Sequence, residues 1–285
     1  MLELERASLI LERDPFMPVF LDQLVAATRS RVDARKANTT LPALEREANK
    51  HTPRGFRRAL LKDSRSAAVI AELKKASPSR GLIRREFSID ELAPELEVSG
   101  ASALSVLTEE DHFQGSLAYL RRASEITKLP CLRKDFIVDE FQIVEARANR
   151  ADAILLIVAS LSDDDLRRFN RKAKELGLDV LCEVHDEAEL ERALALGFET
   201  IGVNNRNLRT FEVTLDTAMR LAERMSARSD LLRVAESGIR SHEDIVRLQH
   251  AGYGAFLIGE SIMAQPRPGV ALRTLLSQPA SNGNG

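Results

Sequence analysis

The stretch AAVIAELKKASPSRG, residues 67–81, holds the features that decide the fold of this chain. It opens with an apolar run, continues with one glutamate and two lysines, and then turns at a serine–proline–serine segment. A short run that is apolar almost throughout is typical of a parallel strand covered on both faces. Its charged end is either a solvated strand terminus or one edge of a functional site.

The same pattern recurs along the rest of the chain, where short apolar runs alternate with segments of helical periodicity. We expect strands at Ala67–Lys74, Ala103–Thr108, Leu129–Asp135, Ala153–Val158, Asp179–His185, Thr200–Asn205, Leu231–Glu236 and Ala255–Gly259. Eight strand–helix units, repeated at intervals of roughly 25 residues, predict an α/β fold of the (β/α)8 TIM-barrel type. A doubly wound, Rossmann-like sheet is disfavoured because no glycine-rich turn follows the first strand.

Several helix ends carry clear signals. A small polar residue followed by acidic residues satisfies the free backbone amides and the dipole at a helix start, and glycine commonly ends a helix. On these signals we expect helices that start at Ser162, Asp186 and Ser241 and end at Gly177, Gly197 and Gly252.

The chain before the first strand has a different pattern. Helical spacing appears in Pro18–Arg35, Leu41–Ala48 and Phe56–Leu61. We expect residues 1–66 to form a helical N-terminal extension packed on the barrel rather than a separate domain, and residues 67–276 to form the catalytic barrel. The composition of residues 277–285, SQPASNGNG, predicts a disordered tail.

The overall composition is that of an ordinary globular protein. Hydrophobic residues make up 44% of the chain and charged residues 29%, and 43 acidic against 41 basic residues nearly cancel. No basic tract suggests nucleic-acid binding, and no apolar run approaches the roughly 18 residues that span a membrane. Because the N-terminal segment also lacks a signal-peptide pattern, we expect a cytoplasmic protein without nucleic-acid or membrane partners.

Charged and amide side chains gather at the carboxyl ends of the expected strands. In a barrel, alternate strand residues point inward and chemistry collects at the carboxyl ends. This alternation places Glu72 and Lys74 at the mouth of the barrel and turns Lys75 outward. The other polar residues that end strands on the inner face are Lys134, Glu183, Asn204, Arg206 and Glu236. A solvated strand end explains any one of them alone, but not all of them together.

Two loops near the end of the chain favour a phosphate site. Ser237-Gly238 follows the seventh strand and Gly259-Glu260 follows the eighth, where barrels often bind phosphate through backbone amides. At such a site only the amide of Glu260 is useful, so we expect its carboxylate to point away. Ser77 and Ser79 can add hydroxyl donors from the first loop, although a Ser-Pro-Ser segment is also an ordinary turn.

The histidines and cysteines show neither a metal nor a disulfide pattern. None of the histidines has metal-ligand spacing: His51, His112, His185, His242 and His250. His112, in the loop after the second strand, is a candidate substrate contact. Cys131 and Cys182 have outward parity on non-adjacent strands, and we expect both to be small apolar fillers beneath the helices.

Taken in order, these segments resemble the indole-3-glycerol phosphate synthase family. The resemblance rests on ELKKASPSRG (72–81), SVLTEEDHFQGS (105–116), LRKDFIVDEFQI (132–143), CEVHDEAEL (182–190), IGVNNRNLRTFEVTL (201–215), ESGI (236–239) and FLIGESIM (256–263). It extends loosely to the helical N-terminal region. The chain departs from the family pattern at Ala235, where serine is frequent, and at Leu73, where an aromatic or other apolar residue occurs; neither is a proposed catalyst.

The resemblance implies a reaction that closes an indole ring without a metal or cofactor. Its substrate is 1-(2-carboxyphenylamino)-1-deoxyribulose 5-phosphate, and its products are indole-3-glycerol phosphate, carbon dioxide and water. The only expected partner is therefore a small phosphorylated molecule, and we expect a monomer or weak homo-oligomer. The substrate carries a benzoate carboxylate and a phosphate at opposite ends, which suits a ring of charges.

The resemblance also implies roles for the charged residues. Lys134 is the acid that protonates the substrate ketone, and nearby cations or burial would lower its pKa toward neutrality. Glu183 stabilises the iminium cation and can act as a base, while Lys74 holds the benzoate carboxylate. Glu72 orients Lys74 or shares in the proton transfers.

The remaining implied residues bind the substrate. Asn204 and Arg206 position the anthranilate end, and Glu236 accepts hydrogen bonds from the substrate hydroxyls. The implied phosphate site consists of Ser77, Ser237, Gly238, Gly259 and the backbone of Glu260, and the implied flanks of the aromatic ring are Leu107 and Phe113.

Two alternatives remain open at this point. One is another phosphate-binding barrel enzyme, either phosphoribosylanthranilate isomerase or a Schiff-base aldolase. The aldolase would form a covalent imine at Lys74 or Lys134, and the isomerase usually relies on a Cys/Asp pair that the first strand lacks. The other alternative is a non-catalytic barrel that scaffolds a partner, for which the charged ring would be dispensable.

Overall fold

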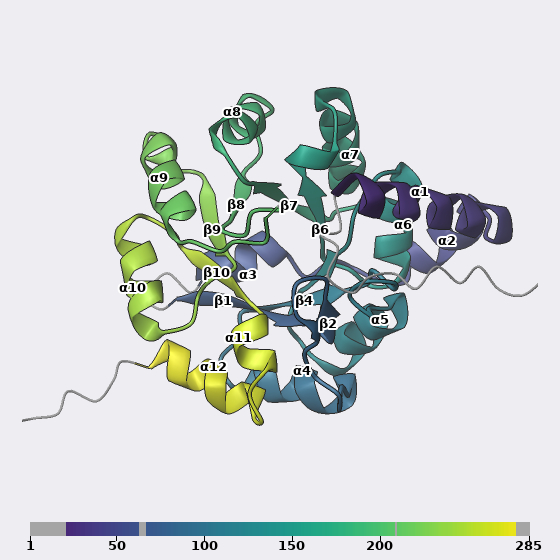
Figure 1. The fold of residues 1–285 in the computed structure, drawn as a ribbon. Coiled ribbons are helices and arrows are strands. Elements are labelled where there is room, and N and C mark those ends of the chain that lie inside the picture. Colours follow the sequence, from purple (N-terminus) through teal and green to yellow (C-terminus); the bar gives the residue numbers. More distant parts are fainter. Residues whose placement is uncertain (1–20, 63–66, 209, 278–285) are drawn as a thin grey trace, which may run out of the picture.

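The computed structural model describes residues 21–62, 67–208 and 210–277, which build a closed barrel of eight parallel strands (Figure 1). The strands follow one another in the order β1-β10-β9-β8-β7-β6-β5-β4, and β4 pairs with β1 to close the barrel. Their bounds are β1 Ala68–Leu73, β4 Ala103–Leu107, β5 Cys131–Lys134, β6 Ala153–Ile157, β7 Asp179–Val184, β8 Thr200–Asn204, β9 Leu232–Glu236 and β10 Ala255–Ile258. Each strand lies within one of the expected ranges, so the (β/α)8 prediction is confirmed.

Helices surround the barrel and alternate with its strands (Figure 1). They are α4 Ile89–Val98, α5 Leu117–Ile126, α6 Glu140–Ala148, the 3-10 turn η1 Val158–Ser160, α7 Asp163–Glu175, α8 Glu187–Ala195, α9 Asp216–Met225, α10 His242–His250, α11 Glu260–Met263 and α12 Pro268–Leu276. The three expected starts are confirmed, because the side chains of Ser162, Asp186 and Ser241 each accept a hydrogen bond from a backbone amide of the first helical turn. The expected terminal glycines all have positive φ angles.

The segment after β1 forms more structure than the sequence predicts. Ala76–Ser77 (β2) pairs antiparallel with Gly81–Leu82 (β3) in a small two-stranded sheet. The pairing folds the SPSR segment back on itself above the barrel mouth. This hairpin fixes where the Ser77 and Ser79 side chains lie.

The core has two layers because alternate strand residues face opposite sides of the barrel wall. The outer layer packs strand residues against the helices and contains Cys131 and Cys182, which are buried and not in a disulfide. Their expected role as apolar fillers is therefore confirmed. The inner layer contains small and branched side chains such as Ile70 and Leu155.

The barrel is closed at its amino-terminal end by the helix α3 Phe56–Lys62. Phe56 and Leu60 of this helix are 0% and 2% exposed and belong to the same apolar cluster as the inner barrel residues. The helix therefore fills the base of the barrel, opposite the carboxyl ends of the strands.

Two further helices precede α3, at Leu21–Asn38 (α1) and Leu41–Ala48 (α2). The second has the bounds expected from the sequence. The first ends three residues later than expected. Its expected start at Pro18 lies outside the described residues, as do residues 1–17 of the expected extension and residues 278–285 of the expected tail. Val32 of α1 packs on Val138 and on Phe141 of α6.

A buried aspartate ties the chain before β1 to the base of the barrel. Asp152, at the start of β6, is 0% exposed and accepts hydrogen bonds from the Cys131 amide at 2.7 Å and from Arg54 Nη2 at 2.6 Å. The His51 ring lies 3.2 Å away through Nε2. Burial would raise the pKa of Asp152, but the hydrogen bonds from His51 and Arg54 outweigh it and lower the pKa.

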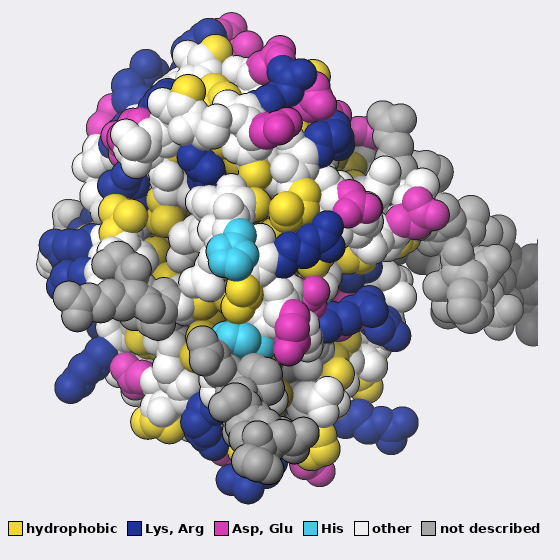
Figure 2. All heavy atoms as spheres, turned by 90° about the vertical axis from the view of Figure 1, so that its left-hand side faces the viewer, with side chains coloured by type: hydrophobic (Ala, Val, Ile, Leu, Met, Phe, Trp, Pro, Cys, Tyr) yellow, Lys and Arg dark blue, Asp and Glu magenta, His cyan; other side chains and the backbone are white. Residues whose placement is uncertain are grey.

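The surface around α9 and α10 mixes charges of both signs. Figure 2 shows basic and acidic side chains interspersed on this side, with small apolar areas between them. Arg247 of α10 pairs with Asp216 of α9 at 3.4 Å. Among the described helices, none combines the length and apolar character needed to cross a bilayer.

Candidate active site

A cavity of about 690 Å³ opens at the carboxyl ends of the strands. The residues that the sequence nominated, apart from His112, line it: Glu72, Lys74, Ser77, Leu107, Phe113, Lys134, Glu183, Asn204, Arg206, Glu236, Ser237, Gly238, Gly259 and Glu260. They come from β1, β4, β5, β7, β8, β9 and β10 or from the loops that follow them. The period of two along each strand therefore selected the inward residues correctly.

Glu72 and Lys74 form a pair at the end of β1. Lys74 Nζ lies 2.5 Å from Glu72 Oε1, and Ser105 Oγ on β4 donates to Glu72 Oε2 at 3.4 Å. A Cβ atom on Gly259 would lie 2.6 Å from Glu72 Oε1, so only glycine leaves room for this carboxylate. Lys75 does not line the cavity, as expected from its parity.

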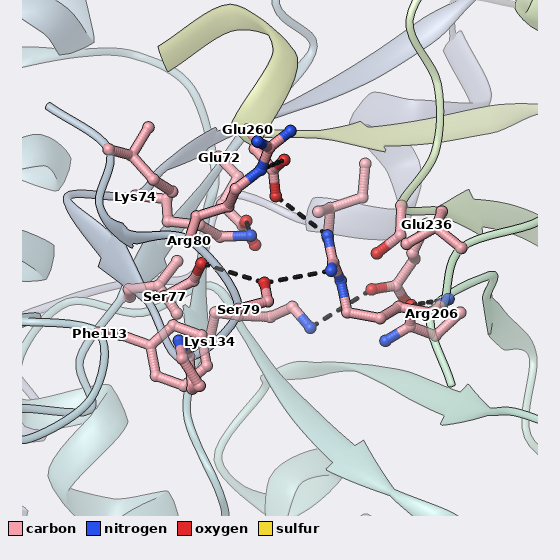
Figure 3. A pocket seen from close by; sticks show the side chains of 18 of the residues that line it. Glu72, Lys74, Ser77, Ser79, Arg80, Phe113, Lys134, Arg206, Glu236 and Glu260 are labelled. Atoms are coloured by element: carbon pink, nitrogen blue, oxygen red, sulfur yellow. Dashed lines mark hydrogen bonds and ion pairs between the residues drawn. The ribbon is translucent and has the colours of Figure 1, made fainter. Parts of the chain in front are cut away.

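Lys134, at the end of β5, lies between two carboxylates in the centre of the cavity (Figure 3). Its Nζ donates to Glu183 Oε2 on β7 at 2.7 Å and lies 3.3 Å from Glu236 Oε2 on β9. Asn204 Nδ2 on β8 donates to Glu183 Oε1 at 3.2 Å, and Asn204 Oδ1 accepts from the Arg206 amide. The cluster is a cation surrounded by carboxyl groups.

This arrangement corrects the expected direction of the Lys134 pKa. Burial lowers it, as expected, but the carboxylates of Glu183, Glu236 and Glu72 outweigh burial and raise the pKa above its usual value. The neighbours of the ammonium are anions, which favour its charged form. Lys134 is therefore fully protonated at neutral pH.

The pKa values of the two carboxyl groups beside Lys134 are shifted in opposite directions. Burial would raise the pKa of Glu183, but Lys134 and His185 outweigh it and hold that pKa well below the usual range. Burial raises the pKa of Glu236 to about 8, and the Glu183 and Glu72 carboxylates add to this effect against the pull of Lys134. Neighbouring groups whose pKa values differ in this way can serve as separate acid and base.

A glycine in β8 makes room for one of these carboxylates. A Cβ atom on Gly202 would lie 2.0 Å from Glu236 Oε1, well inside van der Waals contact. The sequence reveals only a glycine in an expected strand, which can indicate a close approach of any neighbour. Gly202 was not nominated, and no signal in the chain names its partner.

The nominated phosphate residues lie together on one side of the mouth. Ser237 and Gly238 have φ angles of 64° and 83°, and a Cβ atom on Gly238 would lie 2.8 Å from Val213 Cγ1. Gly238 therefore has a conformation that favours glycine, and its backbone is free to approach an anion closely. Gly259 and Glu260 flank the same region.

The side chain of Glu260 lies otherwise than expected. Its carboxylate lines the cavity, accepting from Arg80 Nε at 2.7 Å and from Arg206 Nη2 at 3.0 Å (Figure 3). Arg206 Nη1 also donates to Ser79 Oγ at 3.1 Å. Despite partial burial, the pKa of Glu260 is lowered by the two arginines. The expectation that this carboxylate points away is wrong, because Arg80, which was not nominated, comes within reach.

Phe113 forms one wall of the cavity, and a buried carboxylate holds its loop. Glu109 accepts from the backbone amides of His112 at 2.7 Å and Phe113 at 3.1 Å, and it pairs with Arg31 Nη2 of α1 at 2.8 Å. The His112 ring faces Glu109, and His112 does not line the cavity, so its nomination as a substrate contact is not supported. The Phe113 ring lies 6.4 Å from that of Phe136.

Glu109, Asp111 and His112 place three potential metal ligands within 4.8 Å of one another. Arg31 pairs with both Glu109 and Asp111, so a guanidinium already supplies the positive charge at this position. We therefore assign no metal to this group.

A family model and two similar proteins of known sequence share one description. The family model described as indole-3-glycerol phosphate synthase matches residues 21–275. A protein of that description from Koribacter versatilis (strain Ellin345) is 58% identical over 257 residues, which cover 90% of this chain and 98% of the relative. Another, from Azoarcus sp. (strain BH72), is 46% identical over 263 residues, which cover 91% of this chain and 99% of the relative.

Proposed function

Since this chain belongs to the indole-3-glycerol phosphate synthase family, we propose that its cavity residues carry out the ring closure for which that family is named. The enzyme is a decarboxylating lyase of tryptophan biosynthesis. It converts 1-(2-carboxyphenylamino)-1-deoxyribulose 5-phosphate into indole-3-glycerol phosphate, carbon dioxide and water. The observation that carries the assignment of roles is the Lys134 ammonium held 2.7 Å from Glu183 and 3.3 Å from Glu236.

In the first step, the ring carbon that bears the carboxylate attacks the ketone. The lone pair of the ring nitrogen drives this attack, and Lys134 gives a proton to the ketone oxygen as it becomes a hydroxyl. The nitrogen is left as an iminium cation, which the Glu183 carboxylate stabilises. The reaction therefore moves positive charge from Lys134 to the substrate beside the same carboxylate.

This transfer of charge explains how a lysine with a raised pKa can act as an acid. Before the reaction, Glu183 and Glu236 stabilise the ammonium and raise the pKa of Lys134. As the iminium charge develops near Glu183, that carboxylate is shared between two cations. Its pull on the Lys134 proton weakens when the proton must leave, so the acid strengthens during the step.

In the later steps, carbon dioxide and water leave. The carbon–carbon bond to the carboxylate breaks, and its electron pair neutralises the iminium. The new hydroxyl then departs as water with a proton from Lys74, and a carboxylate takes the proton released by the adjacent methylene group. We assign that base to Glu183. One net proton is taken up per turnover, because a carboxylate anion leaves as neutral carbon dioxide.

The other residues hold the two ends of the substrate. We assign the phosphate to the backbone of Gly238, Gly259 and Glu260 together with Ser77 and Ser237. The benzoate carboxylate goes to Lys74, with Asn204 and Arg206 at the anthranilate end. Glu72 orients Lys74 from 2.5 Å, Glu236 hydrogen-bonds the substrate hydroxyls, and Leu107 and Phe113 flank the aromatic ring.

The Schiff-base alternative fits the central lysine poorly. A lysine that forms an imine must first lose its proton, which requires a lowered pKa. Lys134 has the opposite shift, because two carboxylates lie within 3.3 Å of its Nζ atom. Borohydride should therefore trap no covalent adduct between Lys134 and the substrate.

The direct test is to incubate the purified protein with the substrate and follow the appearance of indole fluorescence. We expect turnover by the wild type and by Lys75→Ala, which removes a lysine next to the site but outside the cavity. Folded wild-type protein that forms no product between pH 5 and pH 9 would refute the proposed function.

We further propose that the protein works in the cytoplasm as a monomer or weak homo-oligomer without nucleic-acid partners. We also propose that residues 67–276 form its catalytic barrel. The unpaired thiols of Cys131 and Cys182 suit a reducing compartment. Size-exclusion chromatography with light scattering checks the oligomeric state, and cell fractionation checks the compartment.

A further inference from the structure

A histidine outside the cavity contacts the proposed base. His185 directly follows β7, and its ring lies between two carboxylates. Nε2 is 3.2 Å from Glu183 Oε1, and Nδ1 is 3.0 Å from Glu189 Oε2. His185 does not line the cavity and so does not touch the substrate.

The two contacts favour a doubly protonated ring. Nδ1 hydrogen-bonds Glu189, whereas Nε2 lies at ion-pair distance from Glu183 Oε1 without hydrogen-bond geometry. Neither ionised carboxylate can donate a hydrogen bond, and a cationic ring is attracted to both. Burial lowers the pKa of His185, but Glu183 and Glu189 outweigh it and raise the pKa to about 10. His185 is therefore an imidazolium cation at neutral pH.

Glu189 is anchored by the first turn of α8. Its amide donates to the Asp186 side chain at 2.9 Å, and its carboxylate accepts from the His185 amide at 2.9 Å. The Nδ1 contact thus connects the ring to a helix end rather than to a mobile surface group. The helix start holds Glu189, and Glu189 holds His185 against Glu183.

The groups that face Glu183 show what His185 adds. Lys134 from β5 binds Oε2, while Asn204 from β8 and His185 both face Oε1. Glu72 on β1 contributes negative charge to the same cluster, whereas Glu236 on β9, with its pKa raised to about 8, is largely protonated at neutral pH. Lys134 becomes neutral when it donates its proton, and His185 is then the cationic side chain that remains beside Glu183 after the iminium charge is neutralised.

We propose that His185, held by Glu189, is a positioning residue that keeps Glu183 ionised and oriented after Lys134 has given up its proton. The inference rests on the proposed function, since it assigns a partner to the base of that reaction. The imidazolium takes no part in proton transfer itself. It is a permanent counter-charge, whereas Lys134 is a transient one.

The first test compares the pH dependence of kcat in three variants. His185→Ala removes the ring, His185→Gln leaves an uncharged donor near the position of Nε2, and His250→Asn removes an exposed histidine of α10 as a control. An opposite charge at this range typically lowers a carboxyl pKa by 1–3 units, so its loss raises the pKa of Glu183. We expect the acid limb of kcat to move up by at least about one pH unit in both His185 variants.

The two His185 variants separate the charge of the ring from the polar side chain that fills its place. We expect His185→Ala to lower kcat at the optimum about tenfold or more, because Glu183 loses a partner that orients it, with KM within about threefold of the wild type. His185→Gln should recover most of kcat at high pH but keep the shifted limb. If the alanine variant is unfolded by circular dichroism, the glutamine variant carries the test.

The second test does not depend on turnover. Nuclear magnetic resonance of ¹⁵N-labelled histidine, assigned by comparison with His185→Gln, should show a cationic ring through pH 8. Glu189→Gln should lower the ring pKa by at least about one unit, because one of the two facing charges is lost. A ring that is neutral at pH 7.5 would overturn the inference.

The outcomes distinguish the two proposals. An inactive wild type refutes the proposed function. An active wild type whose acid limb is unchanged in His185→Ala and His185→Gln refutes the role of His185 alone. A shift in the His250→Asn control would also count against the inference, because it would show that the limb does not report the Glu183 contact.

Discussion

Replacing Gly202 by alanine tests whether the position of Glu236 controls catalysis. The new Cβ atom would lie 2.0 Å from Glu236 Oε1 and 3.1 Å from Leu181 Cδ1. Ordinary contacts of a Cβ atom begin at about 3.4 Å and essentially none are shorter than 3.0 Å, so the carboxylate must move by at least about 1 Å. The ion pair between Glu236 and Lys134, now 3.3 Å long, would be disturbed directly.

A displacement of about 1 Å in an active site can cost about 100-fold in rate, and we expect a loss of kcat of that order. Overpacking of a well-packed core typically costs about 1–3 kcal/mol, so the protein should remain folded. The assay is the initial rate of indole fluorescence at saturating substrate, with urea unfolding as the measure of stability.

The matched control is Gly254→Ala, whose Cβ atom would meet nothing closer than Leu232 Cδ1 at 3.5 Å. We expect normal kcat for this variant. A shorter side chain in Gly202→Ala/Glu236→Asp should relieve the contact and recover part of the lost rate. A folded Gly202→Ala protein with kcat within twofold of the wild type would show that the reasoning about Glu236 is wrong.

Three other outcomes follow from the same contacts. Lys134→Ala should lose at least about two orders of magnitude in kcat in the fluorescence assay while still folding, and a near-normal rate would exclude Lys134 as the acid. Asp152→Ala, which leaves Arg54 without its buried partner, should lower the free energy of unfolding in urea by about 3 kcal/mol with little change in kcat. The pKa of Asp152 is lowered in the folded protein, so this carboxylate stabilises the fold at neutral pH and ceases to do so as pH falls below about 4. If Asp152→Ala lowered the free energy of unfolding equally at pH 3 and pH 7, this would be contradicted. Burial raises the pKa of Glu236 to about 8, so this group ionises at lower pH in the unfolded chain, and the stability of the folded protein falls between about pH 4.5 and pH 8. Glu236→Gln should therefore raise Tm more at pH 8 than at pH 5. A gain in Tm that is the same at both pH values would contradict the assignment.

The architecture could be predicted because it depends on patterns local to each strand. An apolar run such as Ala153–Ile157 is buried on both faces, and its length and flanking helix signals identify a barrel strand without reference to any partner. The inward residues followed from the same runs, since the alternation along a strand is fixed by the pleat. The set of inward-facing polar side chains at the strand ends, from Glu72 to Glu236, could therefore be predicted from the sequence.

What the sequence left open depends on residues far apart in the chain. The direction of the Lys134 pKa is set by Glu183 and Glu236, whose distances to the ammonium exist only after the barrel closes. Glu260 points into the cavity because Arg80 lies 180 positions earlier in the chain yet within 2.7 Å. The spacing of His185 and Glu189 was visible as a helix start, but a contact with Glu183 was not.

The helix that fills the base of the barrel also determines how protons reach the centre. Phe56 and Leu60 close the inner layer from below, and the side chains above them in that layer are apolar. Among the described residues, water therefore has access to Lys134 from the cavity mouth, where the product sits after the reaction. In the proposed reaction Glu183 ends each turnover with the methylene proton 2.7 Å from Lys134 and can return it there, so the one net proton is owed to Lys74. That proton enters by the mouth through which the product leaves, so the two events share a single route.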